Sequence, residues 1–263
     1  MRKECQFFNQ AQSRMNISIL SYNIWGMPWG CRNIHELLLW IFCKSGAEII
    51  CLQEVFSKSC RLIIQEKARA AQWQVFFPED PCWAGACINS FHSGSGLCIL
   101  VKSTVEVLEE IPFVAFYHVE SYVEKLVSKG YFGVVLQKEG VSFSIINTHL
   151  ISDVTECSPF RIAHGHGRRL QEKQLIEGAT NLKDPMLVVG DLNQEAHHYF
   201  HRMYPDEDYT FPNTLEQLDH VVCLPRDQSL FEVKEVCFFQ DIVYSDHIPL
   251  KVTVQVKSKC KAD

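Results

Sequence analysis

Short apolar runs recur along the chain and are bounded by turn-forming residues. Runs that alternate between apolar and polar positions, or that are continuously apolar, are typical of strands in a buried sheet. We therefore expect about ten strands, at residues 16–25, 48–55, 73–77, 96–102, 131–137, 141–150, 186–193, 220–225, 233–239 and 247–256. The sequence KEG at 138–140 separates two of these runs and predicts a hairpin.

Other stretches carry apolar residues at helical spacing, and they predict helices at 34–45, 60–72, 167–182 and 195–204. Helices alternate with strands in some places, and hairpin-like pairs occur in others. This mixture predicts an α/β fold, a four-layered sandwich in which two mixed β-sheets pack face to face with helices outside. No Pro/Gly/Ser-rich linker divides the chain, so we expect a single domain over 1–263 with a flexible segment at 1–16.

The apolar stretch at 36–43, within the helix predicted at 34–45, contains an uninterrupted apolar row from Leu37 to Phe42. Such a helix is apolar on every side, which favours a position between a sheet and neighbouring loops. Docking on a membrane is the alternative, because exposed aromatic residues favour the membrane interface. The loop before the helix offers the residues Trp25, Met27, Pro28 and Trp29 for such a contact.

Composition narrows the class of protein. The chain has 263 residues, 47% of them hydrophobic, which is enough for a large core. No apolar window is long enough to span a bilayer, and the polar start does not read as a secretory signal, so we expect a soluble, cytoplasmic protein. The twelve cysteines include several within apolar runs, such as Cys51, Cys98 and Cys223, and we expect buried free thiols. Cys82 and Cys87 lack the spacing of a zinc site.

Net charge is −6 at pH 7, and the chain has no basic cluster beyond RRLQEK. This balance argues against a protein that grips long nucleic acid by charge alone. It leaves open a short anionic substrate held through a metal ion.

Several strands end in an acid, an amide or an imidazole. These residues are Asn23 in SYNIWG, Glu54 in CLQEV, His149 in NTHL, Asp191 and Asn193 in GDLN, Asp219 and His220 in LDHV, and Asp246 and His247 in SDHIPL. Any one of them alone is typical of a turn. Together they indicate a site, because open sheets collect ligands and catalytic groups at strand ends.

The chemistry of these residues converges. Carboxylate and amide oxygens are the ligands that Mg²⁺ takes, usually one or two carboxylates with water and phosphate completing the shell. His247 follows an acid directly and is a candidate general base. The set predicts metal-assisted attack of water on a phosphate ester.

The ordered series N, QE, THL, GDxN, D and SDH, from about Ser18 to Leu250, resembles the endonuclease/exonuclease/phosphatase superfamily. The segments SYNIWGMP, ICLQEV, SGLCILVKS and SKGYFGVVLQ look most like its neutral sphingomyelinase branch. The resemblance implies a single catalytic domain with a Mg²⁺-dependent phosphodiesterase activity. Mn²⁺ or Co²⁺ are alternatives, because oxygen-rich sites accept several metals.

The resemblance also implies roles for individual residues. Glu54 would be the main Mg²⁺ ligand with Asn23 beside it, and Asp191 would lie near metal and water. Asn193 and His149 would hold the phosphate oxygens. Lys129 and Gly130 would belong to a phosphate-facing segment, and His247 would activate water, oriented by Asp219 or Asp246.

The sequence departs from the family pattern in three places. His220 stands where an aromatic residue is usual, the run GLCILVKSTVEVLEE lacks the usual Ser-Arg-Tyr-Pro turn, and the membrane-spanning tail of some animal relatives is absent. Any contact with a bilayer is therefore expected to be peripheral.

The expected activity is hydrolysis of sphingomyelin to ceramide and phosphocholine by a monomer. A nuclease or an inositol phosphate phosphatase of the same superfamily is the alternative, and a noncatalytic binding protein on the same fold is a third. The lack of a basic patch disfavours the nuclease.

Some remaining motifs favour structural interpretations. His197 and His201 are four apart on the predicted helix at 195–204, which favours a solvated face over zinc. The segment HSGSG at 92–96 favours a hairpin turn. The basic residues Lys125, Arg161, Arg168 and Arg169 are candidate headgroup partners.

Overall fold

The computed structural model describes residues 13–25, 33–79, 94–118, 127–153, 165–194, 197, 199–204 and 209–259. The elements in the first sheet and its helices are β1 (Arg14–Asn23), α1 (Ile34–Cys43), β2 (Ile49–Gln53), α2 (Lys58–Ala70), β3 (Trp73–Phe76), β4 (Cys98–Lys102), β11 (Phe231–Phe238) and β12 (Leu250–Lys257). Those of the second sheet are β5 (Glu106–Ala115), β6 (Gly130–Lys138), β7 (Val141–His149), α4 (Gly165–Ala179), β8 (Met186–Asp191), β9 (His201–Arg202) and β10 (Asp219–Cys223). The short 3₁₀ helix η1 (Pro225–Leu230) precedes β11.

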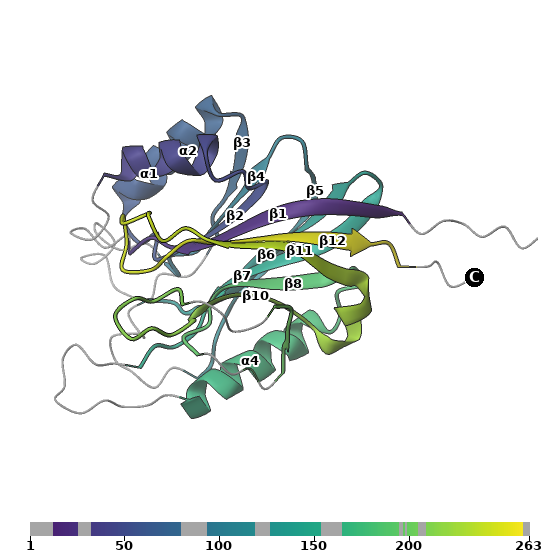
Figure 1. The fold of residues 1–263 in the computed structure, drawn as a ribbon. Coiled ribbons are helices and arrows are strands. Elements are labelled where there is room, and N and C mark those ends of the chain that lie inside the picture. Colours follow the sequence, from purple (N-terminus) through teal and green to yellow (C-terminus); the bar gives the residue numbers. More distant parts are fainter. Residues whose placement is uncertain are drawn as a thin grey trace, which may run out of the picture.

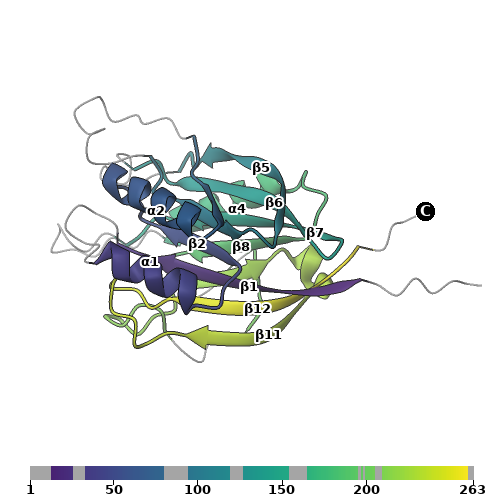
Figure 2. The ribbon, with the colours of Figure 1, turned by 90° about the horizontal axis from the view of Figure 1, so that it is seen from above.

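Each sheet has six strands, in the orders β11-β12-β1-β2-β4-β3 and β5-β6-β7-β8-β10-β9. Both are mixed, because β1 pairs parallel with β2 and β7 pairs parallel with β8, whereas the other pairings are antiparallel. The sheets face each other, with α1 and α2 outside the first and α4 outside the second (Figures 1 and 2). The four-layered α/β sandwich predicted from the sequence is confirmed.

Three apolar clusters hold these layers together. The largest lies between the sheets and includes Ile17, Phe143 and Val254. A second joins the first sheet to α1 and α2, and a third joins the second sheet to α4. In central strands such as β1 and β8, residues alternate between the inner cluster and an outer cluster, so one residue of register shift would exchange the two faces.

Most predicted strands and helices are present, but two strands were not predicted and one helix was predicted wrongly. The strand predicted at 96–102 ends at Lys102, as β4 does, but no strand was predicted at Glu106–Ala115, which forms β5. The helix predicted at 195–204 is wrong, because His201–Arg202 form strand β9, which pairs with β10. His197 and His201 therefore do not share a helical face.

The predicted hairpin at 138–140 is confirmed. Lys138 pairs with Val141, and the two residues between them, Glu139 and Gly140, both have positive φ, at 52° and 75°. This is the conformation that tight hairpin turns require. At the start of the chain, β1 begins at Arg14, which is within the segment predicted to be flexible. Residues 1–12 lie outside the described ranges.

Helix α1 packs against the first sheet through Leu37, Leu38, Trp40 and Ile41, which are buried. Leu39 is the exception, with 62% of its surface exposed. The helix therefore has a buried face and an exposed face. The predicted packing against the sheet holds for the buried face. Of the loop residues named for docking, Trp25 is 42% exposed, whereas Met27, Pro28 and Trp29 lie outside the described ranges, so the docking alternative stays a hypothesis.

Within the described part of the chain, the helices are too short or too polar to cross a bilayer. Cys51, Cys98 and Cys223 are buried free thiols, as predicted, and Cys82 and Cys87 lie outside the described residues. Ser95 and Gly96, from the predicted turn at 92–96, are buried and precede β4.

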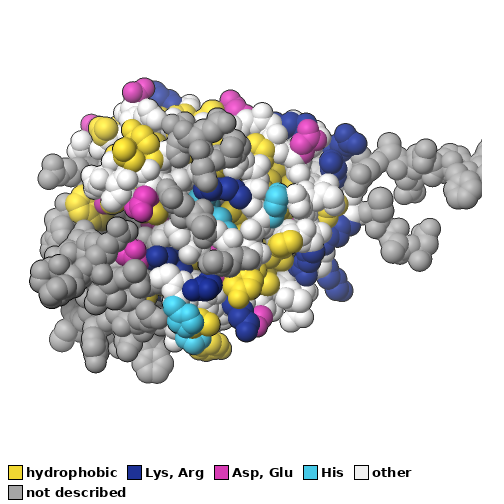
Figure 3. Space-filling view, turned by 60° about the horizontal axis from the view of Figure 1, so that its bottom comes forward, with side chains coloured by type: hydrophobic (Ala, Val, Ile, Leu, Met, Phe, Trp, Pro, Cys, Tyr) yellow, Lys and Arg dark blue, Asp and Glu magenta, His cyan; other side chains and the backbone are white. Residues whose placement is uncertain are grey.

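Lys and Arg side chains gather at the end of the molecule where β1 starts and β12 ends (Figure 3). Arg14 and Lys257 lie opposite each other there, at the start of β1 and the end of β12. Asn23 lies at the other end of β1, roughly 30 Å away at the usual rise of a strand. This basic end is therefore remote from the strand ends that carry the predicted site.

Candidate active site

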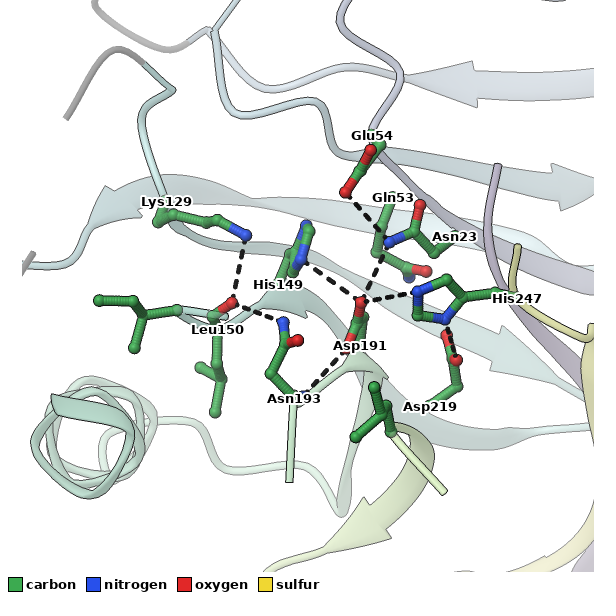
Figure 4. A network of polar contacts seen from close by, with 12 residues as sticks. Asn23, Gln53, Glu54, Lys129, His149, Leu150, Asp191, Asn193, Asp219 and His247 are labelled. Atoms are coloured by element: carbon green, nitrogen blue, oxygen red, sulfur yellow. Dashed lines mark hydrogen bonds and ion pairs between the residues drawn. The ribbon is translucent and has the colours of Figure 1, made fainter. Parts of the chain in front are cut away.

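The candidate active site continues the core between the two sheets. In β1, Ile17 and Ile19 point into the inner cluster, and the same alternation brings Asn23 to that face at the end of the strand. In β8, Leu187 and Val189 do the same for Asp191. The inner face thus changes from apolar to polar where these strands end, and the polar side chains meet (Figure 4).

Asp191 is the centre of the site. Its Oδ2 accepts a hydrogen bond from Asn23 Nδ2 at 3.0 Å and lies 3.4 Å from His149 Nε2 and 3.6 Å from His247 Nε2. Its Oδ1 accepts a hydrogen bond from the backbone N–H of Asn193 at 3.0 Å. Burial raises the pKa of Asp191, and the neighbouring Asp219 raises it further, against the effect of His247. A carboxylate here carries a charge that favours a cation nearby.

Glu54 faces Asp191 across the Asn23 amide, whose Nδ2 also donates to Glu54 Oε1 at 3.3 Å. The amide is oriented by its Oδ1, which accepts from Trp25 N at 3.0 Å. Burial raises the pKa of Glu54, although Lys129 and the hydrogen bond from Asn23 lower it. The two carboxylates therefore converge on one donor in an environment that disfavours their negative charge.

His247 and Asp219 form a pair on the side of Asp191 away from Lys129 (Figure 4). The Nδ1 atom of His247 lies 2.7 Å from Asp219 Oδ2, so its Nε2 is directed toward Asp191. Burial lowers the pKa of His247, but the charges of Asp219 and Asp191 outweigh it and raise the pKa to about 10. Thr210 Oγ1 accepts from the Asp219 amide at 2.9 Å and fixes the start of β10.

The structure places Asp246 differently from Asp219. Asp246 Oδ1 accepts a hydrogen bond from Ser245 Oγ at 3.1 Å, and Ser245 Oγ also accepts from His247 N at 3.2 Å. The charge of Asp246 raises the pKa of Glu54. Of the two acids that the sequence offered as partners for the imidazole, Asp219 is therefore the one in contact with its ring.

Lys129 and Asn193 share one acceptor. Lys129 Nζ donates to the carbonyl of Leu150 at 3.1 Å, and Asn193 Nδ2 donates to the same oxygen at 3.0 Å. The loop after β7 thus draws a buried cation and an amide to the side of the site away from His247 (Figure 4). Both groups are hydrogen-bond donors, as a phosphate requires.

His149 lies between these donors and Asp191. Burial lowers its pKa well below the usual value, and the charges of Lys129 and His247 lower it further. The imidazole is therefore neutral at physiological pH, and its buried Nδ1 has no hydrogen-bond partner among the described residues. A neutral His149 donates through one nitrogen without adding charge to the site.

The site rests on an amide pair that the sequence analysis did not single out. Gln53 Nε2 donates to Asn147 Oδ1 at 2.9 Å and so joins β2 to β7 across the two sheets. Asn147 Nδ2 donates to the carbonyls of Leu52 and Cys98, each at 2.9 Å. Period-two alternation from His149 would have placed Asn147 on the same inner face, so the signal was present in the sequence.

Gly190, the glycine of GDLN, directs Asp191 because it allows two strands to approach closely. It lies within β8 with φ at 145°, and a Cβ atom there would meet the carbonyl oxygen of Thr148 at 1.9 Å. The absence of a side chain lets β7 and β8 approach closely, with His149 in register with Asp191.

The donor set fits a divalent cation of the hard type. No three His, Cys, Asp or Glu side chains within the described ranges are arranged to enclose an ion. Mg²⁺ needs only one or two carboxylates, because water and phosphate complete its shell. Glu54 and Asp191, both raised in pKa by burial and both bonded to Asn23, supply those oxygens.

Comparison with known proteins identifies the family of the chain. The sequence profile of the Endonuclease/Exonuclease/phosphatase family matches residues 20–247, a range that includes every candidate residue from Asn23 to His247. The chain belongs to this family. The resemblance predicted from the sequence motifs is thereby confirmed. The family comprises hydrolases of phosphate esters, which supports a hydrolase.

The proteins that this chain is similar to have names that describe different activities. Sphingomyelinase C 2 of Leptospira interrogans is 28% identical over 205 residues, a match that covers 71% of this chain and 32%, or about a third, of the relative. TDP2 of D. rerio, solved with a single-strand DNA product, gives a TM-score of 0.68 at 13% identity over 91% of this chain and 98% of that chain. A beta toxin mutant of Staphylococcus aureus with bound magnesium ions gives 0.59 at 16% identity, over 93% and 100% of the two chains.

Proposed function

We propose that the chain is a Mg²⁺-dependent phosphoric diester hydrolase of the sphingomyelinase C type, which splits sphingomyelin into ceramide and phosphocholine. The observation that carries the proposal is the His247–Asp219 pair, at 2.7 Å, facing the buried carboxylate Asp191. A base, an anionic centre and donors for phosphate are what hydrolysis of a phosphodiester requires.

In this proposal, His247 takes the proton of the attacking water. Its Nδ1 is engaged by Asp219, which selects the tautomer and leaves Nε2 to accept the proton. Asp219 then stabilises the imidazolium that forms, while its backbone N–H donates to Thr210 Oγ1 and fixes the start of β10.

The phosphate lies on the other side of Asp191. Asn193 and Lys129, which meet at the carbonyl of Leu150, donate to its oxygens, and neutral His149 adds a third donor. These groups stabilise the charge that builds on phosphorus-bound oxygens during attack. Their positions are fixed before the substrate arrives, so little reorganisation accompanies the reaction.

Glu54, Asn23 and Asp191 would hold the divalent cation. Bound there, it supplies charge stabilisation for the phosphate and lowers the pKa of adjacent water and imidazolium groups. The pKa of His247 is about 10 without a cation, and a bound cation would lower it toward the range of a general base.

The sphingomyelin assignment is supported by the relative named for that activity, at 28% identity over 71% of the chain. A nuclease is the second candidate, because TDP2, solved with a DNA product, has the same fold. The net charge of −6 favours the lipid diester, since nucleic acids bind through basic surfaces. In the lipid case, contact with the bilayer is peripheral.

One assay tests the proposal. The purified protein is incubated with sphingomyelin vesicles, lysophospholipid, single-stranded DNA and inositol phosphates, each with Mg²⁺ and with a chelator. We expect phosphocholine release from sphingomyelin only with Mg²⁺. Cleavage of DNA or of inositol phosphates alone would reject sphingomyelin as the substrate.

Two variants test the roles within the site. Glu54→Ala and His247→Ala should each lower kcat by roughly 100-fold or more, because one removes the cation site and the other the base. Circular dichroism should report an intact fold. His201→Ala, on β9, is the matched control and should keep full activity. Full activity in Glu54→Ala or His247→Ala would contradict the assigned roles.

A further inference from the structure

Behind the candidate site, on the outer face of the second sheet, lies a second polar network. Because side chains alternate along a strand, the residue after a site residue points the opposite way. His220 follows Asp219 in β10 and is fully buried on that outer face. Its Nε2 lies 2.9 Å from the carbonyl oxygen of Gln194 and 2.8 Å from that of Gln217.

These contacts define the state of the His220 ring. Both neighbours of Nε2 are carbonyl oxygens, which only accept, so Nε2 carries the proton and donates to them. Burial lowers the pKa of His220 well below its usual value, and the charges of His197 and Arg202 lower it further. His220 is therefore a neutral donor that connects β10 to the first residues after β8.

Glu172 of α4 reaches the same loop from the opposite side. This carboxylate is fully buried, and its Oε1 accepts from the side chain of Gln194 and lies 3.3 Å from His197 Nδ1. The His197 and His220 rings pack edge to face, with centroids 4.4 Å apart. Gln194 is thus held through its carbonyl by His220 and through its side chain by Glu172.

Gln194 is bonded directly to Asn193, which has an unusual backbone. Asn193 has φ at 51°, a conformation that costs energy for a residue with a side chain. Its amide donates to Asp191 Oδ1 and its side chain to the carbonyl of Leu150. Anchoring the following residue on both sides maintains this conformation.

We propose that His220, together with Glu172, is a positioning residue that holds the loop after β8 from behind the sheet, so that Asn193 stays directed at the phosphate. The inference rests on the proposed function for the role of Asn193, whereas the positioning itself is a property of the fold. It also gives a purpose to the histidine that stands where the family usually has an aromatic residue. The N–H of the ring supplies two hydrogen bonds that a phenyl ring lacks.

The positioning is tested without an activity assay. His220→Phe keeps a ring and removes the donor, and His220→Gln returns an N–H. Amide hydrogen exchange by NMR should show the Asn193 amide exchanging roughly tenfold faster or more in His220→Phe. Exchange in His220→Gln should approach that of the natural chain. Unchanged exchange at Asn193 in His220→Phe would overturn the proposal.

Val222→Ala is the matched control, because Val222 lies on the same outer face of β10 and packs in the cluster with α4. This variant loses packing but leaves the contact with Gln194 intact. We expect a lower melting temperature with unchanged exchange at Asn193 relative to the neighbouring strand amides. An equal increase in the exchange of the Asn193 amide in both variants would show that His220 has only a structural role.

Kinetics then test whether the positioning matters for catalysis. In His220→Phe, kcat should fall by roughly 10- to 100-fold with little change in KM, because small misplacements of a reacting group are costly. In an Asn193→Ala background, the same change should cause no further loss. Equal losses in both backgrounds would show that His220 does not act through Asn193. If the natural chain cleaves no phosphodiester, the proposed function fails, while the exchange measurement still decides the positioning.

Discussion

At the scale of single residues, three of the seven described non-glycine residues with positive φ lie at the candidate site. Trp25, Glu54 and Asn193 have φ at 43°, 61° and 51°, in the left-handed region that side chains other than glycine rarely adopt. Each is at or just beyond a strand that ends in the site. Such conformations persist where surrounding contacts determine them, and they direct side chains in ways that regular strands do not.

His247 gives a prediction about pH. Its pKa is about 10 in the folded chain and about 6.5 when unfolded. Its charge therefore stabilises the metal-free protein fully below pH 6.5, and this stabilisation is lost as pH rises toward 10. We expect the free energy of unfolding of the natural chain to exceed that of His247→Gln at pH 6, with a smaller difference at pH 9.5. Urea unfolding in chelator measures it.

The control for this measurement is His35→Gln, since His35 is exposed on α1. Its unfolding free energy should follow that of the natural chain at both pH values. A difference between the natural chain and His247→Gln that grows with pH would contradict the ion pair.

At Glu54, removal of the charge is expected to raise the stability, whereas at His247 it is expected to lower it. Burial raises its pKa, so its ionised form costs stability once pH exceeds the folded pKa. Glu54→Gln keeps the size of the side chain and an acceptor for Asn23 but removes the charge. In chelator at neutral pH, we expect this variant to be more stable by about 0.5–2 kcal/mol, as replacements at functional sites often are. A lower midpoint in urea would refute this account of the site charge.

At the scale of elements, the close contact between β7 and β8 brings His149 opposite Asp191. Gly190→Ala places a methyl group 1.9 Å from the carbonyl oxygen of Thr148, where only backbone movement can relieve it. We expect a loss of at least about 3 kcal/mol in unfolding free energy, with activity lost as well. Gly140→Ala is the control, because a Cβ atom at Gly140 would meet no other atom within 4 Å. This variant should lose only about 1 kcal/mol of unfolding free energy, from its positive φ.

The elements that the sequence failed to predict have physical reasons. Strand β5 (Glu106–Ala115) is an edge strand with several exposed glutamates and two register shifts, so it lacks the period-two pattern of a buried strand. Strand β9 has two residues and follows a histidine-rich stretch that mimics helical spacing. Core strands such as β2 and β8 were predictable because their residues are buried on both faces.

The site itself was predictable as a set of residues and less so as an arrangement. The motifs indicated Glu54, Asp191 and His247, because polar residues interrupt apolar strands there. Which acid contacts the imidazole was not readable, because Asp219 and Asp246 reach the site from different parts of the chain. The contacts of His220 were also hidden, since they depend on a loop carbonyl rather than on a residue type.

At the scale of the whole molecule, the two sheets close around one apolar core that ends in the site. If the proposed cation site is correct, binding at that end should stabilise the entire fold, because the proposed ligands come from both sheets. Glu54 follows β2 of the first sheet, and Asp191 ends β8 of the second. An ion that joins them opposes separation of the sheets.

This gives a prediction about metal removal. At Mg²⁺ concentrations 100 times the dissociation constant, the free energy of unfolding should rise by about 2.7 kcal/mol. The melting temperature should rise with added Mg²⁺ and return to its starting value on chelation. Glu54→Gln should lack this response, and an equal Mg²⁺ response in that variant would place the ion elsewhere.

The turn at Glu139 and Gly140 lies at the far end of β7 from His149, roughly 26 Å along the strand. Loop tips of this kind tolerate inserted sequence when the surrounding space is open. A fluorophore or an affinity tag placed between these two residues would thus label the protein without disturbing the end that carries the candidate site. The same turn offers an attachment point for immobilising the protein with its candidate site toward a vesicle.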